Sequence, residues 1–128
     1  MLTHQPLVAF VGASDPNRAK AFYQGTLGLQ LVEENPYVLL FHAGGTQLTV
    51  SITPKVVLAG YTVLGWIVDD IRAKIPDMSA AGIVFERYPG MEQDELGIWT
   101  VPGAGAMVAW FKDPDGNTLS LTQMPKRY

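Results

Sequence analysis

The chain contains an internal repeat, which constrains its fold more than any single motif does. Leu7–Asp15 aligns with Thr62–Asp70, and Gly45–Ser51 aligns with Gly116–Thr122. In each half the aligned segments enclose a helical pattern and further short apolar runs. A unit repeated in this way is built twice with the same order of elements. The sequence therefore predicts an α+β chain made of two βαβββ modules.

The first half begins with a buried strand and a capped helix. The short apolar run Leu7–Ala13 predicts the strand. Asp15 followed by Pro16 predicts the N-cap and the first turn of the helix, and Gly28 predicts its C-terminal end. Three more strands are expected in this half, over Leu29–Glu33, Tyr37–His42 and Gln47–Ile52.

The second half follows the same order with one added segment. Thr62–Val68 predicts a strand, and Asp69-Asp70 predicts the cap of a second helix. Pro76 should kink or split that helix, and Gly82 should end it. Three more strands are expected, over Ile83–Tyr88, Ala106–Phe111 and Thr118–Thr122, with the added segment Pro89–Gly105 as a loop that has room for a short strand.

The last predicted strand of each half alternates apolar and polar side chains. Leu48 and Val50 face one side and Gln47 and Thr49 the other, and the strand around Ser120 repeats this pattern. The helix of each half can cover the apolar face. The polar face is compatible both with an ordinary exposed sheet and with a sheltered, partly wet cavity.

Composition and charge exclude several classes of function. The 128 residues include no cysteine, which excludes disulfides, thiolate metal sites and a cysteine nucleophile. The net charge of −3, without a run of Lys or Arg, gives no support for a nucleic-acid or membrane partner. No signal peptide or membrane-spanning segment is apparent, so a cytoplasmic protein is expected. The two histidines, His4 and His42, are expected at the surface.

Two motifs inside the repeat resemble those of the glyoxalase/bleomycin resistance protein/dioxygenase superfamily, also called vicinal oxygen chelate (VOC) proteins. Phe22–Leu29 resembles the family's FY…LGL helix exit, and Trp110–Leu119 resembles its F-x-DPDGN hairpin. The resemblance extends from about Leu7 to Gln123 and implies one VOC domain over residues 1–128. It implies a βαβββ module at about 5–52, a linker at about 53–60 and a module at about 61–124, forming a curved mixed β-sheet around a cavity.

The resemblance also identifies the positions from which metal-using members draw His or Glu ligands. In this sequence they are Val8, Thr49, Val63 and Ser120. Two of these side chains are aliphatic, and neutral hydroxyls are poor ligands for divalent transition metals. The resemblance therefore implies the fold and the cavity, and we expect no metal and no other cofactor.

The cavity is expected to combine an apolar floor, neutral polar groups and aromatic side chains, as small-ligand sites do. Trp66 and Phe111 should instead lie in the core. Glu92, Asp94 and Glu95 of the added segment either solvate a loop or attract a cationic ligand, and Trp99 either lines the cavity or seals it or a dimer interface. The predicted ligand-binding residues are Val8, Phe10, Gln47, Thr49, Val63, Trp99, Trp110 and Ser120.

Such a cavity has groups for binding but no identified catalytic residue, so we expect binding of an uncharged or cationic, partly aromatic organic molecule, as in resistance or sequestration proteins. An alternative is a lyase, isomerase or dioxygenase-type enzyme in the same cavity, with a glyoxalase-like lyase as the first choice. A further alternative is a dimeric interaction module without a small ligand. A homodimer is expected because VOC proteins often assemble cavities from two chains and because an edge strand such as Leu7–Ala13 needs a cover.

Overall fold

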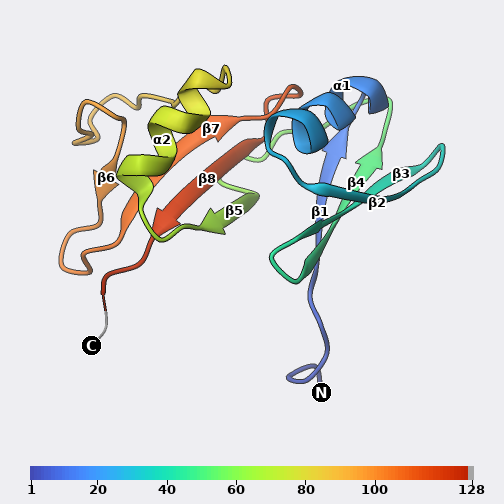
Figure 1. The fold of residues 1–128 in the computed structure, drawn as a ribbon, viewed down its shortest axis with the longest axis horizontal. Helices are drawn as coiled ribbons and strands as arrows, with labels where there is room; N and C mark the ends of the chain where they lie inside the picture. The colour runs from blue at the N-terminus through green and yellow to red at the C-terminus, as the bar shows by residue number, and fades with distance from the viewer. Residues whose placement is uncertain (127–128) are drawn as a thin grey trace. The chain divides into compact units, whose positions relative to one another are not determined.

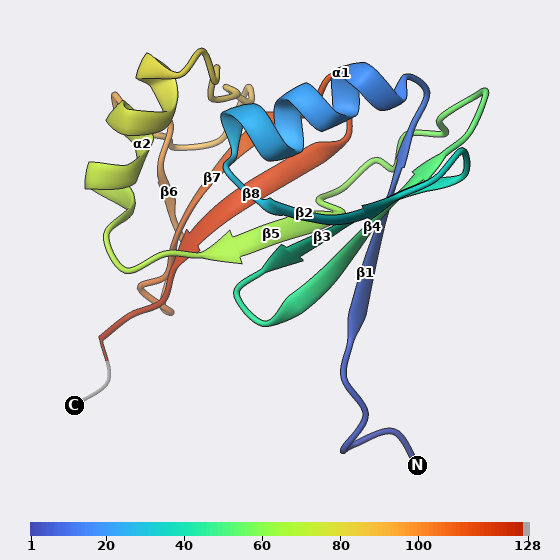
Figure 2. The ribbon, with the colours of Figure 1, turned by 45° about the vertical axis from the view of Figure 1, so that its right-hand side comes forward.

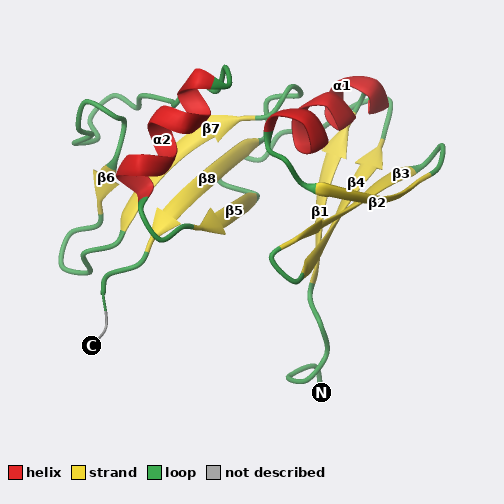
Figure 3. Ribbon diagram, in the orientation of Figure 1, coloured by secondary structure: helices red, strands yellow, loops and turns green. Residues whose placement is uncertain are grey.

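Two βαβββ modules follow each other in the structure, a computed structural model that describes residues 1–126 (Figures 1 and 3). They fall into two units. The first unit comprises Met1–Leu58 with the turn Asp113–Asn117, and the second comprises Ala59–Lys112 with the segment that begins at Thr118. Each unit contains one helical segment and one four-stranded mixed sheet, which confirms the predicted fold class.

The sheet of the first unit has the strand order β1-β4-β3-β2. Strand β1 (Val8–Ala13) runs parallel to β4 (Thr46–Ile52), and β3 (Val38–Ala43) lies antiparallel between β4 and β2 (Gln30–Glu34). The first and last residues of these four strands lie within one residue of those expected from the sequence. Strand β1 therefore forms one edge of this sheet.

The helix of the first unit starts as predicted and then changes from an α-helix to a wider π-helix. The carboxylate of Asp15 accepts hydrogen bonds from the backbone N–H groups of Asn17 and Arg18 at 2.9 and 3.2 Å, which caps α1 (Pro16–Lys20). The helix continues as the π-helical segment η1 (Ala21–Thr26), in which one more residue fits into the turn. The spacing of apolar residues did not predict this change.

The core of the first unit lies between its helix and one face of its sheet. Val11 of β1, Phe41 of β3 and Val50 of β4 are at most 5% exposed. The ring of Tyr23 is also buried and lies 5.9 Å from that of Phe41. Figure 2 shows the helical segment over this sheet. The apolar face predicted from the alternation in β4 is therefore the covered face.

The sheet of the second unit has the strand order β5-β8-β7-β6. Strand β5 (Leu64–Ile67) runs parallel to β8 (Thr118–Gln123), and β7 (Met107–Lys112) lies antiparallel between β8 and the short β6 (Trp99–Thr100). This unit repeats the order of the first with a much shorter outer strand. The added segment supplies that strand, as the sequence allowed.

The prediction of a strand over Ile83–Tyr88 is wrong. This segment makes only one isolated β-bridge, between Phe85 and Phe111. The side chain of Gln93 uses the backbone groups that a strand would need. Its amide donates to the carbonyl of Glu86 at 3.0 Å and accepts from the backbone N–H of Tyr88 at 2.8 Å. The segment is thus a loop whose backbone groups bond to the side chain of Gln93, where a strand would bond to a neighbouring strand.

The second helix, α2 (Ile71–Ala80), is capped by Asp70, which accepts a hydrogen bond from the backbone N–H of Ala73 at 3.2 Å. Pro76 lies inside this helix, and of the two predicted effects, a kink or a split, the split does not occur. Proline removes one helical hydrogen bond, and the buried face formed by Ile71 and Ile75 offsets that loss. The helix ends just before Gly82, which has a φ of 97°.

The core of the second unit contains one of the two aromatic residues expected there, and the other packs at its edge. Phe111 is fully buried, and the ring of Trp66 stacks on it at 6.3 Å. The prediction for Phe111 is therefore confirmed, while Trp66 is only half-buried beside it. Among residues 1–126, no helix is long and apolar enough to cross a lipid bilayer.

Candidate functional site

The first unit holds four of the eight predicted binding residues on one face of its sheet. Val8 pairs with Gln47, and Phe10 pairs with Thr49, across the parallel strands β1 and β4. Thr49 is buried and accepts a hydrogen bond of 3.4 Å from the amide of Gln47. Phe10 is 61% exposed. This face therefore presents one exposed aromatic ring beside small polar groups.

The second unit holds the other four residues, also on one face. Trp110 pairs with Ser120 across β7 and β8, and Trp99 pairs with Val108 next to it. Val63 lies two residues before Gly65, which is the β5 partner of Ser120, and strand alternation places it on the same face. The structure thus brings the predicted residues together in two groups of four, one on each unit.

Three aromatic side chains, which we call the aromatic wall, are fixed against each other on the second unit. The ring of Trp110 lies 5.6 Å from that of Tyr88, edge to face, and 6.1 Å from that of Trp99. The indole N–H of Trp110 donates to the hydroxyl of Thr62 at 3.0 Å. Aromatic rings fixed in this way offer a ready surface for a flat ligand. The sequence predicted both tryptophans but not Tyr88.

Two clefts open beside the aromatic wall, and Tyr88 and Met91 line both. The Trp110 cleft has a volume of about 340 Å³ and is also lined by Thr62, Lys112 and Thr118. The larger Trp99 cleft, of about 730 Å³, extends along the added segment and is also lined by Arg72, Glu92 and Asp94. The added segment therefore shapes both clefts. Alternation along strands does not predict these loop residues.

Two acidic residues of the added segment, Glu92 and Asp94, line the Trp99 cleft, and Asp94 is also bound within the loop. One carboxylate oxygen of Asp94 accepts hydrogen bonds from the backbone N–H groups of Leu96 and Ile98, each at 2.9 Å, and the other lies 2.9 Å from the guanidinium of Arg72. Burial by itself would raise the pKa of Asp94, but these donors and the charge of Arg72 lower it below its ordinary value. Asp94 thus holds the loop together, while Glu92 lines the Trp99 cleft.

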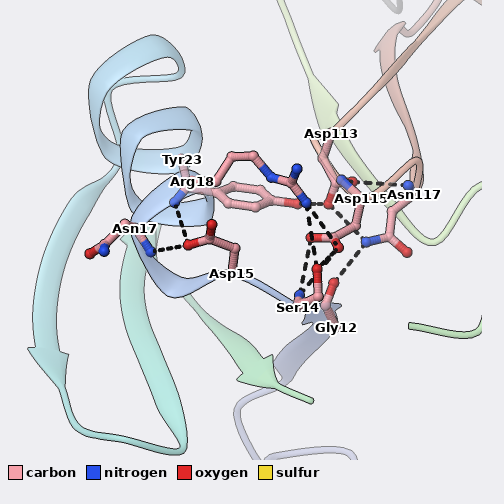
Figure 4. Close-up of polar contacts among 9 residues, drawn as sticks. All are labelled: Gly12, Ser14, Asp15, Asn17, Arg18, Tyr23, Asp113, Asp115 and Asn117. Carbon is pink, nitrogen blue, oxygen red and sulfur yellow. Dashed lines mark hydrogen bonds and ion pairs between the residues drawn. The ribbon is translucent and has the colours of Figure 1, made fainter. Parts of the chain in front are cut away.

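The Asp-Pro-Asp-Gly-Asn motif forms a buried polar cluster in the first unit, shown in Figure 4. The hydroxyl of Tyr23 donates to Asp113 at 2.7 Å. The side-chain amide of Asn117 donates to the same carboxylate at 2.8 Å and to the carbonyl of Gly12 at 2.9 Å. Burial, and then the charge of Asp113, raise the pKa of Tyr23. This cluster holds a turn in place, and none of its residues lines either cleft.

A second contact of this turn lies beside the cluster. The hydroxyl of Ser14 donates to the carboxylate of Asp115 at 2.5 Å, and the guanidinium of Arg18 lies 3.6 Å from the same group (Figure 4). The sequence identified this motif as a hairpin turn but not its partners at the start of the first helix.

The four positions that hold metal ligands in metal-using VOC proteins do not fit a transition metal in this chain. Thr49 and Ser120 are buried neutral hydroxyls, and Val8 and Val63 have no donor atom. Within residues 1–126, no group of three or more His, Cys, Asp or Glu side chains lies close enough together to hold a metal ion.

Comparisons with known proteins agree with this architecture. Residues 7–121 match the model of the Glyoxalase/Bleomycin resistance protein/Dioxygenase superfamily. A Vibrio cholerae protein named probable lactoylglutathione lyase is 28% identical, over 96% of this chain and 93% of its own. A solved glyoxalase family protein from Enterococcus faecalis has a TM-score of 0.76 and 22% identity, over 95% of this chain and 99% of its own.

A second solved structure is an antibiotic binding protein from Streptomyces sp., with a TM-score of 0.71 and 24% identity, over 98% of this chain and 99% of its own. At these identities the solved structures establish a shared fold. The family match spans both modules and both motifs that resembled the family in the sequence. The chain belongs to the glyoxalase/bleomycin resistance protein/dioxygenase superfamily.

Proposed function

We propose that this protein binds a small organic molecule without a metal, in the manner of a resistance or sequestration protein. One observation carries the proposal: the four usual ligand positions, Val8, Thr49, Val63 and Ser120, hold no metal ligand, while an aromatic wall stands on the face that carries Ser120. A pocket with aromatic walls and a few neutral polar groups suits binding by contact and stacking.

The polar groups near the wall support binding more than bond-making. Ser120 and Thr62 are neutral hydroxyls, and the indole of Trp110 already donates to Thr62. Neither histidine lines the described clefts beside the wall. The fold shared with the antibiotic binding protein from Streptomyces adds support, because that protein is named for such a role.

Tryptophan fluorescence tests the proposal, since two of the three tryptophans lie in the wall. A library of flat aromatic compounds is titrated against the parent and against the Trp110→Phe and Trp99→Phe variants. We expect the fluorescence response to shrink in at least one of these variants. Trp66→Phe is the matched control, because Trp66 stacks on Phe111 and lines neither cleft. A response that depends only on Trp66, or chemical conversion of every bound compound, would contradict the proposal.

A second candidate function is a glyoxalase-like lyase, favoured by the Vibrio cholerae relative, which this chain matches over 96% of its length. Its test is the formation of S-lactoylglutathione from methylglyoxal and glutathione by the purified protein, with and without added Zn²⁺ or Ni²⁺. Turnover that needs the added metal would favour the lyase. Binding without turnover would favour sequestration. A dimeric module without a ligand would show no thermal stabilisation by any compound.

We also propose that the protein works as a cytoplasmic homodimer. Strand β1 is an edge strand, and the neighbouring side chains of Val8 and Phe10 are 44% and 61% exposed. Exposed apolar side chains on an edge strand are usually covered by a partner. Light scattering should give twice the chain mass of 14.0 kDa. A mass of one chain at micromolar concentration would contradict the dimer.

A further inference from the structure

The Trp110 cleft contains a single charged side chain, that of Lys112. Lys112 lies two residues after Trp110 on β7, so strand alternation places both on the same face of the sheet. Its register partner is Thr118 of β8, two residues before Ser120. A cation therefore lines the same cleft as Trp110 and Tyr88 of the aromatic wall.

The ammonium group of Lys112 has one hydrogen-bond partner and no ion-pair partner among the described residues. It donates a hydrogen bond to the hydroxyl of Thr118 at 2.7 Å and is otherwise exposed. The ion pairs of the described residues are Arg18–Asp115, Lys20–Glu34 and Arg72–Asp94, and Lys112 takes part in none of these three. An ammonium group has three donors, so two stay available for a ligand.

Other groups of the Trp110 cleft can also donate. The hydroxyl of Thr62 accepts the indole N–H of Trp110, which leaves its own proton to donate. Burial, followed by the charge of Glu86, raises the pKa of Tyr88, so its phenol stays protonated at neutral pH. No carboxylate lines this cleft within the described residues. Its polar groups therefore suit an acceptor with negative charge.

We propose that the Trp110 cleft takes an aromatic carboxylate, with the ring against Trp110 and Tyr88 and the carboxylate at Lys112. The inference rests on the proposed binding function and narrows the ligand from a small organic molecule to an aromatic anion. It replaces the uncharged or cationic ligand expected from the sequence, because the only charged side chain of residues 1–126 that lines this cleft is a cation. A carboxylate at Lys112 gains a charge-assisted hydrogen bond that an uncharged amide of the same shape does not gain. The volume of about 340 Å³ suits a molecule of one or two fused rings.

Calorimetric titration with two matched probes, 2-naphthoate and 2-naphthamide, tests the inference at low salt. We expect naphthoate to bind about three- to fivefold more tightly than naphthamide, the preference that one partly exposed charge pair gives. In Lys112→Met the preference should disappear while the affinity for naphthamide stays the same, and Lys112→Arg should retain it. Lys55→Met is the matched control, because Lys55 is an exposed lysine of the first unit.

The possible results separate this inference from the proposed function. If naphthamide binds as tightly as naphthoate, or if Lys112→Met keeps the preference, the inference is overturned while the binding function stands. If neither probe binds the parent, the inference and the proposed aromatic site fail together. The preference should also weaken as salt is raised, because an exposed pair is screened.

Discussion

At the scale of single residues, the phenol of Tyr23 has the most defined role in the first unit. It is 1% exposed, and its only described hydrogen bond within residues 1–126 is the one of 2.7 Å to Asp113. The same carboxylate accepts from Asn117, which also holds the carbonyl of Gly12. Loss of one donor would leave a buried charge with fewer partners, which is costly.

Tyr23→Phe should therefore lower the free energy of unfolding by about 1.5–3 kcal/mol, the range for a hydrogen bond to a charged group. Urea unfolding measures this change. Tyr37→Phe is the matched control, because Tyr37 is 76% exposed and should change stability very little. Equal effects of the two substitutions would show that the hydroxyl of Tyr23 contributes nothing to stability.

The raised pKa of Tyr23 also predicts how stability depends on pH. Its pKa in the folded state lies above the ordinary value of 10.0, so the unfolded chain releases this proton first as the pH rises. The contribution is fully present below pH 10 and is lost above it. Between pH 9 and 11 the parent should lose about 1.4 kcal/mol more stability than Tyr23→Phe. Urea unfolding at the two pH values measures this, and parallel losses would contradict it.

At the scale of elements, the two parallel strand pairs differ at one glycine. Gly65 of β5 lies opposite Ser120, and a Cβ atom at Gly65 would lie 2.6 Å from the hydroxyl oxygen of Ser120. Gly12 of β1 lies opposite Ser51, and a Cβ atom there would meet its nearest neighbour at 3.7 Å. A side chain at Gly65 therefore meets Ser120 too closely, whereas a side chain at Gly12 meets only ordinary van der Waals contacts.

Gly65→Ala should lower the free energy of unfolding by about 1 kcal/mol, because the hydroxyl of Ser120 must leave its preferred rotamer. Gly12→Ala is the matched strand control and should be nearly neutral. Adding Ser120→Ala to Gly65→Ala should recover part of the loss. Thermal unfolding of the parent, of Gly65→Ala, Ser120→Ala and Gly12→Ala, and of the double variant measures the coupling. A Gly65→Ala variant as stable as Gly12→Ala would contradict the close contact.

The elements that the sequence predicted are those fixed by local chemistry. Asp15 and Asp70 cap helices because their carboxylates reach nearby backbone N–H groups, a pattern visible in three or four residues. The strand expected over Ile83–Tyr88 failed because a side chain from later in the chain, Gln93, takes its backbone partners. The π-helical segment after Lys20 has no such local signal.

At the scale of the whole molecule, the sequence predicted part of the candidate site. Trp110 and Ser120 share a face because alternation in β7 and β8 requires it, so this grouping could be inferred. Tyr88 could not, since its position depends on loop hydrogen bonds made by Gln93. Lys112 lies in the Trp110–Leu119 motif that the sequence identified. Its position in a cleft could not be predicted, because the cleft also needs the residues around Tyr61.

The family resemblance predicted the fold and the turn formed by the Asp-Pro-Asp-Gly-Asn motif. It did not predict the binding chemistry, because proteins that share a fold differ in the side chains of their sites. Val8, Thr49, Val63 and Ser120 carry the central claim, because without metal ligands there the site must act through its own side chains. This claim predicts that purified protein holds far less than one transition metal ion per chain by elemental analysis.

One titration tests the central claim most directly. The best ligand from the aromatic library is titrated against the tryptophan fluorescence of the parent protein, before and after exhaustive dialysis against EDTA, and the recovered ligand is analysed for conversion. The account predicts the same Kd in both samples and an unchanged ligand. A Kd that rises more than tenfold after EDTA and returns with added metal, or a converted ligand, would contradict it.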